Sequence, residues 1–130
     1  MSNATLSHTA HNGTCHCGAV HLTIPRKPDY VNDCNCTLCS KHAGLWGYYD
    51  PAEISISGDT RTYIRADMPE PAIRTHFCVM CGCTTHWTML EVFATNHPET
   101  PVRMGLNMRL FEVEVVEGVE VRFPDGRAWN

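Results

Sequence analysis

Eight cysteines in a chain of 130 residues constrain this protein more than any other feature of its sequence. They fall into three close groups: Cys15 and Cys17; Cys34, Cys36 and Cys39; Cys78, Cys81 and Cys83. Cysteines grouped in this way are either disulfide partners in an exported protein or thiolate ligands of metal ions in a reducing compartment. The rest of the sequence has to decide between these two chemistries.

The N-terminal stretch favours metal ligands. Residues 1–14 are polar and carry neither the basic n-region nor the apolar h-region of a secretory signal. We therefore expect a cytoplasmic protein with reduced cysteines, and we keep a disulfide-stapled exported domain as the weaker alternative. Because residues 1–12 have little apolar content, we expect a disordered lead-in there, followed by one zinc domain at residues 13–130.

The charge of the chain excludes several classes of partner. Ten basic and 14 acidic side chains give a formal net charge of −4. Binding to nucleic acid or to an anionic membrane needs clustered Lys and Arg, which this chain lacks. No apolar run approaches the roughly 20 residues that cross a bilayer. We expect neither nucleic acid nor membrane as a partner.

The apolar residues favour a mainly β fold. They come in short runs of alternating apolar and polar residues, and no stretch keeps an apolar stripe at helical spacing. We predict antiparallel β structure with short helical turns around residues 39–43 and 110–112. The predicted strands cover residues 19–24, 45–49, 54–56, 62–64, 84–89, 113–116 and 119–123.

The spacing of four cysteines predicts a closed metal site. In an extended chain, side chains two residues apart point to the same face, so Cys15 and Cys17 can present two sulfurs to one ion. Cys78, Cys81 and the following Gly82 match a zinc knuckle, in which a tight turn brings two sulfurs together. A structural zinc site needs four such ligands. We therefore expect these two pairs to share a structural Zn²⁺.

The remaining group, Cys34, Cys36 and Cys39, predicts an open metal site. A zinc ion with three protein ligands keeps a fourth position for water or substrate, which is the arrangement of catalytic sites. Three thiolates make zinc a weak Lewis acid, which suits a thiol ligand. A bound thiol would lose its proton and attack an aldehyde, or it would leave in the reverse reaction.

Other side chains have less specific expectations. Cys83 is expected to be a buried apolar thiol, although as a fourth sulfur it would close the second site and make it structural. His42 and His86 could donate hydrogen bonds to the metal ligands or act as proton shuttles. Lys41, Arg61 and Arg65 could bind the carboxylates of a substrate. Asp33 or Asp50 could act as a general base.

Three segments resemble the signatures of a known family. They are GTCHCGAV at residues 13–20, CNCTLCSKHAG at 34–44 and FCVMCGCTTHW at 77–87, and together they contain all eight cysteines. In this order and spacing they resemble the glutathione-dependent formaldehyde-activating enzyme (GFA) and centromere protein V (CENP-V) family. The resemblance implies an Mss4-like, mainly β fold with two zinc ions. It also implies a carbon–sulfur lyase that acts on the adduct of glutathione and formaldehyde, S-hydroxymethylglutathione.

By motif, the family's structural zinc positions fall on the four cysteines paired above, and its catalytic positions fall on Cys34, Cys36 and Cys39. Two residues beside the expected catalytic site depart from the family pattern. Asn35 stands where His is common, and Ser40 stands where Arg is frequent. These departures bear on the identity of the substrate.

We therefore expect a zinc enzyme for a small thiol, such as glutathione, or for its aldehyde adduct. The alternative is a non-catalytic zinc module that binds a protein partner, because a shared fold does not fix a function.

Overall fold

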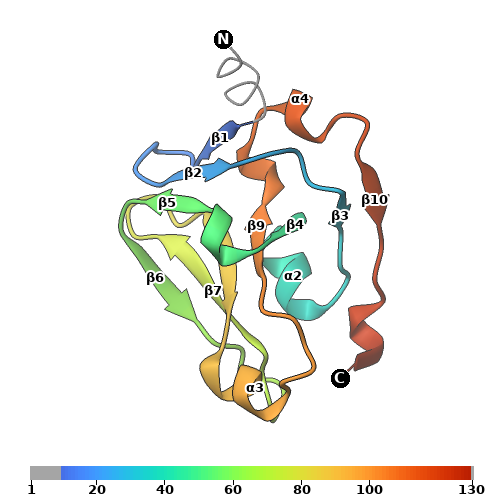
Figure 1. Cartoon of the computed structure of the whole chain (residues 1–130). Coiled ribbons are helices and arrows are strands. Elements are labelled where there is room, and N and C mark those ends of the chain that lie inside the picture. Colours follow the sequence, from blue (N-terminus) through green and yellow to red (C-terminus); the bar gives the residue numbers. More distant parts are fainter. Residues whose placement is uncertain (1–9, 130) are drawn as a thin grey trace.

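The computed structural model describes residues 10–129, in which short strands form two sheets (Figure 1). The smaller sheet has three strands in the order β1 (His11–Thr14), β2 (His21–Ile24) and β5 (Ser55–Ser57). The larger sheet has seven strands, in the order β10 (Glu120–Arg122), β3 (Tyr30–Asn32), β4 (Trp46–Tyr49), β9 (Met104–Asn107), β8 (Thr84–Met89), β7 (Ile73–Cys78) and β6 (Thr60–Tyr63). All the paired strands are antiparallel except β10 and β3, which run parallel.

The helices of the described residues are short. Three of them are α-helical: α2 (Thr37–Lys41), α3 (Glu91–Asn96) and α4 (Val113–Val116). Three are single 3₁₀ turns: η1 (Pro51–Glu53), η2 (Met108–Leu110) and η3 (Gly126–Trp129). In Figure 1, β1 and β2 lie at one end of the molecule and α3 lies at the other, with α2 between β3 and β9. Among residues 10–129, no helix combines the length and the apolar character that a bilayer-spanning segment requires.

The mainly β fold predicted from the sequence is confirmed. Alternation located β2, β4, β5, β6, β8 and β10 to within a few residues. The predicted helical turn at residues 39–43 overlaps α2, and the one at 110–112 begins where η2 ends. The prediction missed β1, β3, β7, β9 and α3, which lack a clean alternating pattern.

The predicted strand at residues 113–116 is wrong, because this segment is the helix α4. In a strand, Val113 and Val115 would share one face. Instead Val115 is buried and Val113 is 73% exposed, which fits one helical turn that inserts a single valine into the core. The β-branched residues suggested a strand, but the packing of Val115 decided the conformation.

The N-terminal boundary also differs from the expectation. Strand β1 begins at His11, inside the stretch 1–12 that was expected to be a disordered lead-in, whose first nine residues lie outside the described part. His11 pairs with Ile24 of β2, and the Thr23 hydroxyl donates to Asn12 Oδ1 at 2.8 Å. Backbone pairing can hold a polar edge strand, and hydrophobic alternation does not reveal such a strand.

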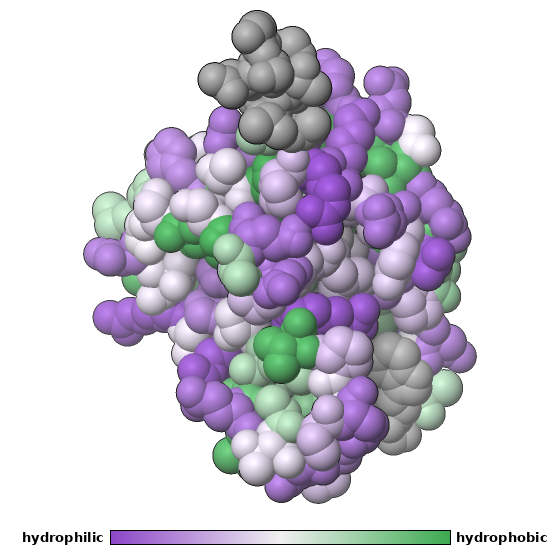
Figure 2. Space-filling view, in the orientation of Figure 1, coloured by the Kyte–Doolittle hydropathy of each residue, from purple (hydrophilic) through white to green (hydrophobic). Residues whose placement is uncertain are grey.

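The buried residues form two separate clusters. The larger cluster fills the space between the sheets with Val20, Leu22, Ile24 and Leu106, and it contains the sulfur-bearing Cys15 and Cys78. The smaller cluster consists of Cys34, Cys36 and Leu38, with Cys39 and Ile73 packed against it. On the face seen in Figure 2, hydrophilic residues separate the apolar patches from one another. The two cysteine groups therefore lie in different packing environments.

Gly58 lies at a close approach between its own turn and the loop that precedes β2. It lies in the turn between β5 and β6 with φ +105°, and a Cβ atom there would collide with the carbonyl oxygen of Ala19. The carbonyl of the next residue, Asp59, accepts a hydrogen bond from the Val79 amide at 3.3 Å, in the turn that follows β7. This glycine therefore allows one turn to contact both cysteine-bearing loops.

We predict that Gly58→Ala lowers the free energy of unfolding by about 3 kcal/mol, because left-handed strain and steric overlap add. The matched control is Gly118→Ala, at φ +82° with no atom within 4 Å of the added Cβ. We expect that variant to lose only about 1 kcal/mol from strain. Urea unfolding of both proteins measures the difference, and equal losses would contradict the close approach at Gly58.

Candidate metal centres

Four sulfurs from two distant turns converge at the edge of the larger core. The Sγ atoms of Cys15, Cys17, Cys78 and Cys81 all lie within 4.8 Å of one another. Cys17 Sγ is 3.6 Å from Cys15 Sγ and 3.7 Å from Cys78 Sγ. Sulfurs around a tetrahedral zinc ion are about 3.8 Å apart, given Zn–S bonds of about 2.3 Å. This donor set therefore fits a zinc ion.

The first of these turns follows β1. Its backbone closes with a hydrogen bond from the Gly18 amide to the Cys15 carbonyl at 3.1 Å, and Gly18 has φ +83°. The Val20 amide donates to Cys15 Sγ at 3.2 Å. A glycine is needed at this position because other residues rarely adopt a positive φ. The turn thereby directs Cys15 inward and gives its sulfur a backbone donor.

The second turn follows β7 and has the same construction. The Gly82 amide donates to the Cys78 carbonyl at 2.9 Å, and the Met80 amide donates to Cys78 Sγ at 3.3 Å. Hydrogen bonds from the amides of Cys83 and Cys17 lower the pKa of the Cys81 thiol to about 5. Amides directed at sulfur stabilise the thiolate form, which is the form that binds metal. The predicted knuckle geometry is therefore present.

The other group lies where β3 leads into α2. The Sγ atoms of Cys34, Cys36 and Cys39 lie within 4.8 Å of one another. Cys36 is the N-cap of α2, and its sulfur accepts a hydrogen bond from the Cys39 amide at 3.2 Å. The Cys36 amide donates in turn to Cys34 Sγ at 3.4 Å. A strand end and the first turn of a helix thus bring three sulfurs together, and we call them the cysteine triad.

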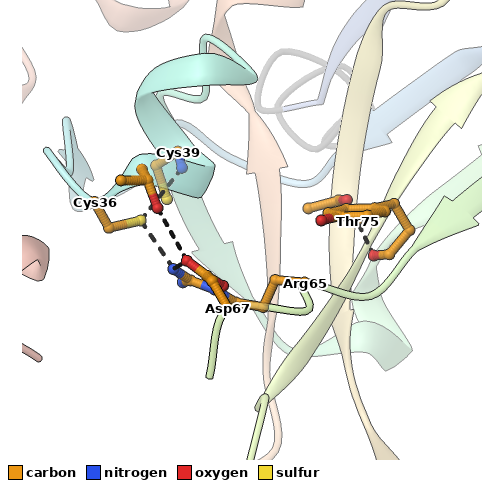
Figure 3. A network of polar contacts seen from close by, with 7 residues as sticks. Cys36, Cys39, Arg65, Asp67 and Thr75 are labelled. Carbon is orange, nitrogen blue, oxygen red and sulfur yellow. Dashed lines mark hydrogen bonds and ion pairs between the residues drawn. The ribbon is translucent and has the colours of Figure 1, made fainter. Parts of the chain in front are cut away.

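A buried arginine lies beside the triad (Figure 3). The Arg65 side chain is 8% exposed, and its Nη1 is 3.9 Å from Cys36 Sγ. Its Nε and Nη2 donate to the two carboxylate oxygens of Asp67 at 2.7 and 2.8 Å, and Thr37 Oγ1 donates to Asp67 at 3.1 Å. Arg65 is therefore not a solvated surface charge, because Asp67 and the sulfur offset the cost of burying its guanidinium.

This environment shifts the pKa values of the three thiols in different directions. Burial raises the pKa of Cys36, but hydrogen bonds from Cys39 and Cys34 and the charge of Arg65 outweigh it, so the net shift is downward. Burial raises the pKa of Cys34 and of Cys39. The Trp46 indole N–H donates to Cys39 Sγ at 3.3 Å. Cys36 is therefore the first of the three to become a thiolate.

The triad forms part of the wall of a cavity of about 330 Å³. Trp46, Trp87 and Phe93 line other parts of it, together with Tyr48 and Arg103. The side chains of Tyr48 and Trp46 share one face of β4, because they are two residues apart. The cavity therefore places aromatic surface and a phenol next to the sulfurs.

The phenol of Tyr48 is held in its neutral form. The Asn32 side-chain amide donates to Tyr48 Oη at 2.6 Å. Burial raises the Tyr48 pKa to about 12. Because its oxygen already accepts from Asn32, the hydroxyl proton is free to point at a ligand. No alternating or motif signal in the sequence marks Asn32 or Arg103 as functional, and neither was a candidate.

The C-terminal segment packs on the triad. Asn35 Nδ2 donates to Asp125 Oδ1 at 2.9 Å, and the Arg127 amide donates to Asn35 Oδ1 at 3.1 Å. Gly126 is buried, and a Cβ atom there would be 2.6 Å from Cys34 Sγ. Asn35, one of the two residues that depart from the family pattern, thus anchors the C-terminal segment beside the triad.

The remaining candidates lie elsewhere. In the described chain, Cys83 belongs to neither sulfur group and lines a different cavity, beside Lys41 and His42. It is half-buried against the larger core, close to the apolar thiol that was expected. His86 is buried against His76, with ring centroids 4.0 Å apart, and burial lowers its pKa to about 3.

The last four candidates do not line the triad cavity. Asp50 caps η1 by accepting from the Ala52 amide at 2.9 Å. Lys41 and Arg61 are exposed. These residues, together with Asp33, are not among those that line the triad cavity.

Comparison with known proteins identifies the family. Residues 10–114 match the family described as "Glutathione-dependent formaldehyde-activating enzyme". The chain is 32% identical over 100 residues to a Halomonas elongata protein named "Putative glutathione-dependent formaldehyde-activating enzyme". That alignment covers 67% of this chain, and the chain spans 58% of the length of this curated relative.

A solved structure supports the fold alone. The crystal structure of a Rhodobacter sphaeroides protein superimposes with a TM-score of 0.61 at 18% identity, covering 85% of this chain and 99% of that one. These matches do not name centromere protein V, so that part of the resemblance stays a prediction. The sequence match spans all eight cysteines, and the chain belongs to the family of glutathione-dependent formaldehyde-activating enzymes.

Proposed function

We propose that this chain is a zinc enzyme of the carbon–sulfur lyase type, which forms or cleaves the adduct of a small thiol, such as glutathione, and an aldehyde. Its four-cysteine group would hold a structural Zn²⁺, and its triad would hold a catalytic one. The observation that carries the proposal is that the three triad sulfurs converge on the wall of a cavity. A zinc ion there would lower the pKa of an incoming thiol and bind its thiolate.

The residues around the triad fit this chemistry. Three thiolates and a divalent ion would carry one net negative charge, and the Arg65 guanidinium, although paired with Asp67, places an N–H donor 3.9 Å from Cys36 Sγ. The Trp46 N–H withdraws charge from Cys39 Sγ. Both contacts limit the electron donation of the thiolates, and a fourth, exogenous sulfur is therefore bound more firmly.

Tyr48 is suited to handle the aldehyde oxygen. In the synthetic direction the thiolate sulfur forms a bond to the carbonyl carbon, and the carbonyl oxygen must gain a proton. A neutral phenol can donate a hydrogen bond to that oxygen as its charge develops. In cleavage the hydroxyl proton returns while the carbon–sulfur bond breaks. The protons therefore balance: in synthesis the thiol loses one proton and the carbonyl oxygen gains one, and in cleavage both changes are reversed.

The alternative of a non-catalytic module needs a fourth protein ligand at the second site. Cys83 is the one cysteine outside the two sulfur groups of the described residues, and it lines a different cavity, together with Lys41 and His42. This location favours an open second site. A reducing, cytoplasmic compartment stays part of the proposal, and it fits the eight free thiols.

We predict opposite effects for two cysteine substitutions. Cys36→Ser removes one of two bound zinc ions and abolishes turnover, but it lowers the free energy of unfolding by only about 1 kcal/mol, because Ser is also a good N-cap for α2. Cys81→Ser opens the cluster that joins the two sheets and unfolds the domain, since structural zinc contributes folding energy directly. Zinc content by mass spectrometry and urea unfolding measure both. Equal unfolding by the two substitutions would contradict separate roles.

We predict that Tyr48→Phe slows turnover of S-hydroxymethylglutathione by about 100-fold, which is the usual contribution of a positioned proton donor. Thiol binding should not change, because the ring is kept. The control is Tyr49→Phe, whose hydroxyl donates to the Arg26 carbonyl at 2.9 Å. Exchange NMR of glutathione and formaldehyde gives the rates. Equal rates in the two variants would remove Tyr48 from the mechanism.

A further inference from the structure

The cavity beside the triad has an unusual balance of charge. Apart from the three sulfurs, its lining is mostly apolar and aromatic, and among the described residues no Asp or Glu contributes to it. The full charges in the lining are those of two arginines, Arg65 and Arg103. Away from the three sulfurs, the described wall of the cavity therefore offers partners for an anionic group and no carboxylate for a cationic one.

The two arginines differ in what they already bind. Arg65 is buried and donates twice to Asp67, so its charge is satisfied. Arg103 is exposed at the cavity, and among residues 10–129 no carboxylate lies within ion-pair distance of its guanidinium. Its five N–H donors suit a carboxylate in a planar, two-point contact.

Arg103 is also held in place. Its guanidinium carbon lies 4.2 Å from the centroid of the Tyr48 ring, a cation–π distance. Tyr48 is fixed in turn by Asn32 and by the Trp87 ring, whose centroid is 5.9 Å away. The charge of Arg103 therefore lies over one aromatic part of the wall, on the strand that also carries Trp46 beside Cys39.

We propose that the ligand of this cavity is a thiol, or the aldehyde adduct of a thiol, with a compact apolar carbon body and one carboxylate that pairs with Arg103. The inference rests on the proposed function for the position of the sulfur, but the role of Arg103 does not. A cavity of about 330 Å³ is at the small end of ligand sites. Such a ligand fits the apolar lining and satisfies the unpaired guanidinium.

Glutathione fits this lining poorly. It carries one ammonium group, two carboxylates and two peptide groups. Burying its ammonium without an acidic partner would be unfavourable, because no Asp or Glu of the described residues lines the cavity. Its ends would have to stay in solvent. The cavity is therefore expected to bind a compact, more apolar thiol more tightly than glutathione, which would remain a weaker substrate.

The test uses the zinc-loaded full chain and four probes. They are 2-benzyl-3-mercaptopropanoate, its carboxamide, the sulfur-free 3-phenylpropanoate, and glutathione. Binding is measured from the NMR shifts of the Trp46 and Trp87 indole N–H groups, because both side chains line the cavity. The variants are Arg103→Gln and the control Arg109→Gln, an exposed arginine that lines a different cavity.

We expect the mercapto-carboxylate to bind about tenfold more tightly than its carboxamide, which is the usual value of one charge-assisted contact. The preference should persist in Arg109→Gln and vanish in Arg103→Gln, and glutathione should bind more weakly than the carboxylate probe. Tighter binding of glutathione, or an unchanged preference in Arg103→Gln, would overturn the inference.

The sulfur-free probe separates this inference from the proposed function. If 3-phenylpropanoate binds as tightly as the mercapto-carboxylate and depends equally on Arg103, the carboxylate site stands and the thiol function fails. If the thiol probes bind more tightly than 3-phenylpropanoate but do not depend on Arg103, the thiol function stands and the carboxylate site fails.

Discussion

The convergence of sulfurs from distant turns is the constraint on which the structure depends. Cys17 and Cys78 are 61 positions apart in the chain, yet their sulfurs are 3.7 Å apart. Four thiolates at such distances repel one another unless protons or a cation neutralise them. Because Cys15 and Cys78 are also buried in the larger core, any ion bound there joins the small sheet to the large one. Metal binding and core packing would then stabilise the same contact.

The triad also consists of cysteines, but its sulfurs differ from the other four in their origin along the chain and in their surroundings. Its sulfurs come from one local segment, so their closeness holds no distant elements together. They lie in a separate small cluster at a cavity wall, and their charge is balanced by Arg65, by backbone amides and by an indole N–H. A metal site whose ligands come from one local segment, at the wall of a cavity, can keep a ligand position open.

Sequence reasoning succeeded where the signal is local. Alternation located β2 and β8, and residue spacing identified the triad and the two cysteine pairs, because turns and strand ends are short-range structures. The two distant pairs were joined by the four-ligand requirement of a structural zinc site. It failed where packing overrode propensity. Valines at 113–116 form the helix α4 because the core accepts Val115 alone, and polar β1 pairs with β2 through its backbone. The burial of Arg65 was not foreseen, since its partner Asp67 lies in an irregular segment.

The sequence by itself determined the mainly β class, the family and the local grouping of the cysteines, because each of these follows from the type and spacing of neighbouring residues. The tertiary structure alone decided what surrounds the triad. Arg65, Tyr48 and Arg103 reach one cavity from separate parts of the chain, and Asn35 meets Asp125 across 90 positions. Such contacts depend on how the sheets pack, and the order of residue types along the chain does not reveal that long-range packing.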